Sequence, residues 1–146
     1  MPLTIVVADD DSVYREIIRY LLASASDTVT IVAEAATGEE ALALVRRERP
    51  DIVITDLVMP GLNGVELTKR TREELPQTKV ILMSSYTEDA YRFMASDSGA
   101  DVFVSKQVIM DGLMPAVRDI IRRRRFCGDS GLPSSGGASA SAAAPK

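Results

Sequence analysis

Five side chains that could do polar chemistry stand where short apolar segments end. The segments 4–8, 52–54, 79–83 and 102–105 lead to Asp9 and Asp10, to Asp56, to Ser84 and to Lys106, respectively. Apolar runs of this length and β-branched content are typical of strands buried in a parallel sheet. Because parallel sheets bind ligands at the carboxyl ends of their strands, we expect the five side chains to share one pocket.

The segment 51–64 has the strongest functional signal. Its apolar run ends on Asp56, and Pro60, Gly61, Asn63 and Gly64 then interrupt regular structure, so Asp56 is predicted at the point where a loop opens. An aspartate in that place can be a nucleophile, a cation ligand or both, or it can merely cap the next turn. The other polar strand ends favour a chemical role.

Crowded carboxylates raise one another's pKa unless a cation compensates their charge. Mg²⁺ is suited to this task, because it binds oxygen ligands and usually takes only one or two carboxylates. Asp56 could then attack phosphorus with its second oxygen, while Lys106 and the Ser84 hydroxyl hold the other phosphoryl oxygens. The predicted product is an aspartyl phosphate.

The composition excludes several other classes of function. The chain has 146 residues, a net charge of −4, one cysteine and no histidine. This size fits one domain, and the charge gives no reason to expect nucleic acid or a membrane as partner. The absence of histidine excludes histidine-based catalysis within this chain, and one cysteine excludes an internal disulfide. Without an apolar stretch of membrane-spanning length or a secretory signal, we expect a cytoplasmic location.

Alternating strand and helix patterns predict an α/β domain with a five-stranded parallel sheet covered on both faces, a three-layer α/β/α fold. Strands are predicted over 4–8, 29–33, 52–56, 79–83 and 102–105, and helices over 14–22, 64–75, 88–97 and 113–121. A further helix is predicted between the second and third strands, with Ala41, Leu42 and Val45 on its inner face and Pro50 as its stop. Ser12 is placed to cap the first helix, and 37–40 form a capping box for the second. Pro115 is expected to lie within the first turn of the last helix, because proline is disfavoured further inside.

The domain is expected to end near Cys127. Residues 128–146 consist mainly of Gly, Ser, Ala and Pro with little to bury, which predicts a disordered tail or the stub of a linker. The domain itself is therefore assigned to residues 1–127.

Over roughly residues 3–125 the chain resembles the receiver domains of response regulators, in the CheY-like superfamily. The matching motifs are Val7-Ala8-Asp9-Asp10, Asp56 with Met59-Pro60-Gly61 and Asn63-Gly64, Met83-Ser84, and Lys106. The resemblance implies a flavodoxin-like fold of five βα units. It also implies a role in two-component signal transduction, in which Asp56 is phosphorylated by a histidine kinase or a histidine phosphotransfer protein.

The resemblance further implies roles for individual residues. Asp10 would bind Mg²⁺ directly, Asp9 through water, and Asp56 and the backbone carbonyl of Val58 would complete the protein ligands. Ser84 would be the switch hydroxyl, and Lys106 would pair with the phosphoryl group. Apart from its own phosphorylation and dephosphorylation, such a domain catalyses nothing.

Four positions depart from common receiver patterns. Gln107 follows Lys106 where many relatives have proline, so no cis peptide bond is expected, since without proline it costs about 3 kcal/mol. Phe103 replaces a common switch tyrosine and has no hydroxyl. Val58 and Tyr86 flank the phosphate in relatives; Val58 cannot orient a water molecule and Tyr86 is bulky. We therefore expect the phosphorylated state to decay slowly.

Signalling would use the surface of the fourth helix, the fifth strand and the fifth helix, which could bind a downstream protein, an output domain or a second copy of the chain. The basic run at 122–125 suits the dipole at a helix C-terminus better than a nucleic-acid contact. We therefore expect this domain to bind no nucleic acid.

Two alternative functions remain open at this point. Asp9 to Val13 also fits the Asp-x-Asp motif of haloacid-dehalogenase-like phosphatases, although that interpretation leaves Asp56 unexplained. The chain could also be the receiver part of a DNA-binding transcriptional regulator, because the region around Lys106 is similar to regulators of the NarL/FixJ type.

Overall fold

In the computed structural model, the described residues are 2–86 and 88–130, with side chains through Arg124. The chain divides into a unit of residues 1–116 and a unit of residues 117–146. The first unit contains the entire sheet and all five predicted site residues.

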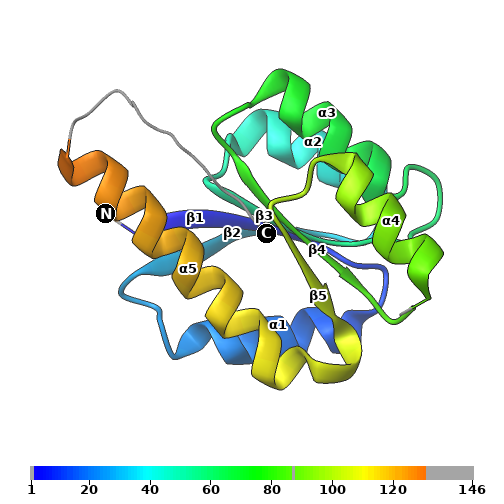
Figure 1. The fold of residues 1–146 in the computed structure, drawn as a ribbon, viewed down its shortest axis with the longest axis horizontal. Coiled ribbons are helices and arrows are strands. Elements are labelled where there is room, and N and C mark those ends of the chain that lie inside the picture. The colour runs from blue at the N-terminus through cyan, green and yellow to red at the C-terminus, as the bar shows by residue number, and fades with distance from the viewer. Residues whose placement is uncertain (1, 87, 131–146) are drawn as a thin grey trace. The chain divides into compact units, whose positions relative to one another are not determined.

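The sheet has five parallel strands in the order β2-β1-β3-β4-β5 (Figure 1). They are β1 (Leu3–Ala8), β2 (Val29–Ala35), β3 (Ile52–Asp56), β4 (Lys79–Ser84) and β5 (Val102–Ser105). Every residue of β3 is buried, as expected for the central strand of a sheet covered on both faces. The five predicted strands are confirmed, with small differences at their ends.

Five α-helices alternate with the strands. They are α1 (Ser12–Ala23), α2 (Gly38–Glu48), α3 (Gly64–Glu74), α4 (Asp89–Ser98) and α5 (Ile109–Ser130), with a short 3₁₀ turn, η1 (Lys106–Val108), before the last. None of the helices in the described part of the chain has the length and apolar character to cross a membrane.

Helices cover both faces of the sheet (Figure 1). On one face, Val6, Val53 and Val80 of the strands pack with residues of α2 and α3 such as Leu42 and Leu67. Side chains alternate along a strand, so Ile5, Val7 and Ile54 point to the opposite face, where α1 buries Ile18 and Leu22. The predicted three-layer α/β/α fold is confirmed.

The cap of α1 differs from the prediction. Asp11, not Ser12, is the N-cap, and its side chain accepts a hydrogen bond of 2.9 Å from the backbone N–H of Val13. Ser12 already belongs to the first turn, where a side chain no longer caps. The predicted cap of α2 is confirmed, since Thr37 Oγ1 accepts from the N–H of Glu40 at 3.1 Å.

The last helix also begins earlier than expected. Because α5 starts at Ile109, directly after η1, Pro115 lies inside the helix and beyond its first turn, and the expectation that it would be confined to that turn was wrong. Because proline has no backbone N–H, the helix lacks one hydrogen-bond donor at this position. No peptide bond between described residues is cis, as expected for Lys106–Gln107.

Helix α5 continues through Ser130, past the boundary expected near Cys127. An established helix can extend by adding one hydrogen bond per residue, even into a sequence with little to bury. Residues 131–146 lie outside the described residues, so the tail stays a prediction.

Gly64 fixes the end of the loop that follows Asp56. Its N–H donates to the carbonyl oxygen of Leu57 at 2.9 Å, and a Cβ atom at this position would lie 2.1 Å from the carbonyl oxygen of Asp56. Only glycine therefore lets α3 begin this close to the end of β3.

We predict that Gly64→Ala destabilises the protein by about 2 kcal/mol or more, because backbone atoms of Asp56 and Leu57 must move to admit the methyl group. Alanine is otherwise the better helix former, so helix propensity alone predicts the opposite sign. Gly112→Ala is the matched control, since its Cβ would meet no backbone atom and only side-chain ends, Val104 Cγ1 at 3.3 Å and Val108 Cγ2 at 3.9 Å. Urea unfolding measures both variants, and equal stability of the two would contradict the prediction.

Candidate functional site

The strand register brings the predicted site residues to one edge of the sheet. Ala8 pairs with Thr55, and Asp56 pairs with Met83, so Asp9, Asp56 and Ser84 follow aligned positions on three adjacent strands. Ser84 in turn pairs with Ser105, and Lys106 is the next residue. The convergence expected from the strand ends is therefore present.

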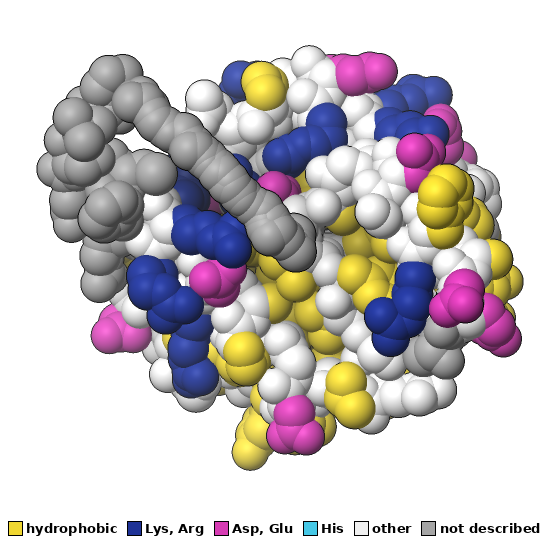
Figure 2. Space-filling model, viewed as in Figure 1, with side chains coloured by type: hydrophobic (Ala, Val, Ile, Leu, Met, Phe, Trp, Pro, Cys, Tyr) yellow, Lys and Arg dark blue, Asp and Glu magenta, His cyan; other side chains and the backbone are white. Residues whose placement is uncertain are grey.

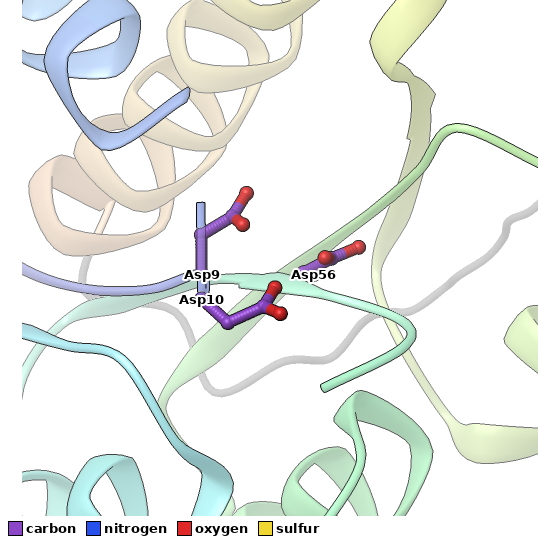
Figure 3. Close-up of side chains that lie close together, drawn as sticks. All are labelled: Asp9, Asp10 and Asp56. Carbon is purple, nitrogen blue, oxygen red and sulfur yellow. The ribbon is translucent and has the colours of Figure 1, made fainter. Parts of the chain in front are cut away.

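Three carboxylates gather at this edge. One oxygen atom from each of Asp9, Asp10 and Asp56 lies within 4.8 Å of the other two, and the side chains of the acid pair point toward Asp56 (Figure 3). Asp9 and Asp56 are buried, whereas Asp10 is exposed. Negative charge is thus concentrated at a site with limited access to water.

Lys106 joins the two buried acids. Its Nζ lies 2.6 Å from Asp9 Oδ2 and 3.1 Å from Asp56 Oδ2, and the residue is 5% exposed. Burial alone would lower the pKa of Lys106, but the hydrogen bonds and charges of Asp9 and Asp56 outweigh burial and raise it. The lysine therefore remains a cation inside the site.

Asp56 combines burial with a shifted pKa. Burial raises the pKa of Asp56 to about 6, and the charge of Asp9 adds to this effect. The charge of Lys106 and hydrogen bonds from Lys106 and the Val58 backbone act in the other direction without cancelling it. Asp56 is a buried carboxylate whose charge is incompletely compensated.

Ser84 is fully buried at the end of β4. Its Oγ accepts a hydrogen bond of 2.9 Å from the backbone N–H of Tyr86. A hydroxyl that accepts in this way still has its own hydrogen to donate. Ser84 can therefore donate a hydrogen bond to a ligand oxygen next to Asp56 while it accepts the hydrogen bond from the β4–α4 loop.

The predicted switch aromatic, Phe103, and the two predicted tuning positions, Val58 and Tyr86, differ in burial. Phe103 is half-buried and packs against the Leu57, Leu82 and Ala95 cluster, with the Arg92 guanidinium 5.9 Å from its ring centroid. Val58 and Tyr86 are both exposed. The Tyr86 ring stacks on Tyr91 of α4, with centroids 4.7 Å apart.

Sequence reasoning missed three residues that contact the site or the loop after Asp56. Arg15 donates a hydrogen bond to the backbone carbonyl of Asp9, and Glu39 Oε2 accepts from the N–H of Leu62 in the loop after Asp56 at 3.0 Å. The ring centroid of Tyr14 lies 4.2 Å from Lys106 Nζ. Tyr14 is only the first residue of a predicted helix in the sequence, and no local pattern indicates the partners of Tyr14, Arg15 or Glu39.

The acid cluster fits a divalent cation. Both oxygens of Asp9 are engaged, since Oδ1 accepts from the Asp11 N–H at 2.9 Å and Oδ2 pairs with Lys106. The carboxylate of Asp10 has no hydrogen bond or ion pair within the described part of the chain. Asp10 and Asp56 are thus the acids placed to bind a metal directly, which matches the preference of Mg²⁺ for one or two carboxylates.

Comparison with known proteins identifies the family. The family model of the response regulator receiver domain matches residues 5–118. The chain belongs to this family.

Relatives of this receiver domain agree with the assignment. The response regulator protein VraR of Staphylococcus aureus is 34% identical over 122 residues, which are 84% of this chain and 58% of VraR. The chain thus spans less than two thirds of the length of the curated relative.

Solved receiver domains have the same fold. The receiver domain of AraT, a response regulator from Geobacillus stearothermophilus, is 32% identical with a TM-score of 0.79, covering 86% of this chain and 98% of that one. A two-component response regulator of the LuxR family from an Aurantimonas species is 30% identical with a TM-score of 0.76, covering 84% and 86%. Fold and family together leave the haloacid-dehalogenase-like alternative without support.

We predict that Asp56→Asn makes this receiver domain more stable by about 2–3 kcal/mol at pH 8 without divalent cations. The pKa of Asp56 is about 6, above its ordinary 3.8, so its contribution to stability is full below pH 3.8 and is lost as the pH rises through 6. Asparagine avoids this loss, and Lys106 keeps Asp9 as its partner.

Urea unfolding in EDTA measures this difference. The matched control is Asp10→Asn, an exposed acid of the same cluster, for which we expect a smaller change. An Asp56→Asn variant less stable than the unmodified protein at pH 8 would contradict the prediction.

Proposed function

We propose that this receiver domain accepts a phosphoryl group on Asp56 in a reaction that requires Mg²⁺. The proposal is carried by the position of Asp56, a buried carboxylate with a pKa of about 6 that faces a second buried acid and a buried lysine. At neutral pH most Asp56 side chains are ionised, and the carboxylate is the form that can act as a nucleophile.

In the proposed reaction, an Asp56 carboxylate oxygen forms a bond to phosphorus while the bond between phosphorus and the donor breaks. The donor would be the phosphohistidine of a sensor histidine kinase or a histidine phosphotransfer protein. Bound Mg²⁺ supplies positive charge that stabilises the transferring phosphoryl oxygens. Asp10, Asp56 and the Val58 carbonyl would hold it directly, and Asp9 would act through water.

Lys106 and Ser84 would bind the phosphoryl group after transfer. Asp56 loses its carboxylate charge when it is phosphorylated, so the Lys106 ammonium would follow the negative charge to the phosphoryl oxygens while it keeps Asp9 as a partner. The Ser84 hydroxyl would donate its hydrogen to another of these oxygens. The phosphorylated state is thereby favoured through groups that already line the site.

Movement of Ser84 would give Phe103 space to turn inward, and the surface next to it would change. In this surface Phe93 and Met94 of α4 and Met110 of α5 are exposed apolar side chains. This surface would bind a downstream protein, an output domain or a second copy of the chain. The domain would have two conformations that differ in this surface, and phosphorylation would shift the balance between them.

A more specific alternative is that the chain is the receiver part of a DNA-binding regulator. The chain covers only 58% of VraR, and the similar Aurantimonas protein is a regulator of the LuxR family. Within helix α5, Arg122 and Arg123 pair with Asp119, which accounts for part of the basic run without nucleic acid. Determination of the complete coding sequence decides, because a helix-turn-helix segment beyond residue 146 would establish the alternative.

The proposed reaction predicts a gain of one phosphoryl group when the protein is incubated with acetyl phosphate and Mg²⁺. Intact-mass measurement should show the adduct on the unmodified protein and none on Asp56→Asn. Asp10→Asn should need more Mg²⁺ for the same rate, because it removes the accessible metal ligand. Asp119→Asn serves as the acidic control and should react normally. An adduct that persists in Asp56→Asn would place the acceptor elsewhere.

We also predict that the phosphorylated protein keeps its phosphate for longer than minutes after the donor is removed. Val58 is an exposed apolar side chain two residues after Asp56 and cannot orient an attacking water molecule. Val58→Asn supplies a polar group there and should speed the loss several-fold, whereas Val32→Asn, at an exposed valine of β2, should not. The decay is followed by intact mass, and loss from the unmodified protein within minutes would count against the prediction.

A further inference from the structure

The aromatic ring of Tyr14 lies against the lysine of the site. We propose that Tyr14 is a positioning residue for Lys106, whose ring face holds the ammonium group between Asp9 and Asp56 and keeps water from it. For catalysis, the inference rests on the phosphorylation of Asp56 proposed above. The contact between Tyr14 and Lys106 is a separate claim and can be tested separately.

The surroundings of the ammonium group support this role. Lys106 Nζ has Asp9 Oδ2 at 2.6 Å, Asp56 Oδ2 at 3.1 Å and the centroid of the Tyr14 ring at 4.2 Å. An ammonium group has three donors, and the two carboxylates engage two directions. The ring lies close enough for the electrostatic attraction between a cation and an aromatic face.

The start of helix α1 fixes the ring in this place. Asp11 caps the helix, and Arg15, the residue after Tyr14, donates to the backbone carbonyl of Asp9. Glu34 of β2 pairs with Arg15 Nε at 3.5 Å and steadies it. Tyr14 therefore lies in a helical turn that is tied to Asp9 on both sides, by Asp11 before it and by Arg15 after it.

A neutral aromatic partner suits the proposed reaction. A further carboxylate beside Lys106 would add negative charge to a site that must accept a phosphoryl group, and would compete for the ammonium. The ring attracts the cation without either effect, so Lys106 can transfer its contact from Asp56 to the phosphoryl oxygens while the ring still restrains it. Loss of the ring should therefore slow phosphorylation and leave Asp56 chemically competent.

The test compares Tyr14→Phe, which keeps the aromatic face, with Tyr14→Leu, which keeps apolar bulk without it. Tyr20→Leu is the matched control, because Tyr20 is also in α1 but is 74% exposed. We expect the rate constant of phosphorylation by acetyl phosphate and Mg²⁺ to fall about threefold to tenfold in Tyr14→Leu. Tyr14→Phe and Tyr20→Leu should react like the unmodified protein.

A second readout does not depend on phosphorylation. In the metal-free protein, the NMR signals of the Lys106 side-chain methylene protons next to Nζ should be shifted upfield by the ring, in the unmodified protein and in Tyr14→Phe. In Tyr14→Leu they should return toward the values of an ordinary lysine. If Tyr14→Leu does not fold, pentafluorophenylalanine at position 14 keeps the shape, reverses the electrostatics of the ring face and should slow phosphorylation equally.

The outcomes separate the two claims. Equal rates for the Leu and Phe variants, or unshifted Lys106 signals in the unmodified protein, would overturn the positioning role of Tyr14. A protein that gains no phosphoryl group on Asp56, but shows shifted Lys106 signals that depend on the ring, would overturn the proposed function and leave the contact intact.

Discussion

The buried ion pair network of Lys106 with Asp9 and Asp56 is the interaction on which the rest of the site depends. Burying an ionised carboxylate is costly unless a partner compensates its charge. Here one ammonium group serves two buried acids, at 2.6 Å and 3.1 Å, so an excess of negative charge remains beside the exposed Asp10. Burial is the main cause of the raised pKa of Asp56, and the charge of Asp9 adds to it. Such a site favours a further cation, and an added phosphoryl group increases the need for one.

The fold keeps these charges together by tying the loops on both sides of the sheet edge to neighbouring helices. Arg15 of α1 holds the carbonyl of Asp9, and Glu39 of α2 holds the N–H of Leu62 in the loop after Asp56. Gly64 lets α3 begin against the backbone of Asp56 itself. The acids are therefore carried by backbone segments with fixed positions, which is what a site for one defined ligand geometry requires.

Strand ends were the part of this structure that the sequence could predict. A buried parallel strand has a strong apolar signature, and the polar residue that follows it must lie at the edge, so Asp9, Asp56, Ser84 and Lys106 could be placed together without coordinates. The contacts that orient these side chains could not be predicted from the sequence. Glu39 and Leu62 are 23 positions apart, and their hydrogen bond follows from the packing of α2 beside the loop, which no local pattern records.

Errors at helix ends have a similar origin. Asp11 and Ser12 are both acceptable N-caps, and the choice depends on the conformation of the turn after Asp9, whose Oδ1 accepts the Asp11 N–H. Pro115 was expected within the first turn of the last helix, but the helix begins earlier, at Ile109 directly after η1. At the start of α1 and at the start of α5, tertiary contacts outweighed the local helix propensity of the sequence.

The contacts of Ser84 explain why a change at the site would reach α4. Ser84 Oγ holds the backbone of Tyr86, and the Tyr86 ring stacks on Tyr91, which packs with Phe103 against one apolar cluster. A hydroxyl drawn toward a phosphoryl group would have to take the Tyr86 backbone with it or release it. Either result disturbs the stack on α4 and the packing around Phe103 together. Because packed side chains rearrange between discrete arrangements, this linkage favours two states over a graded response.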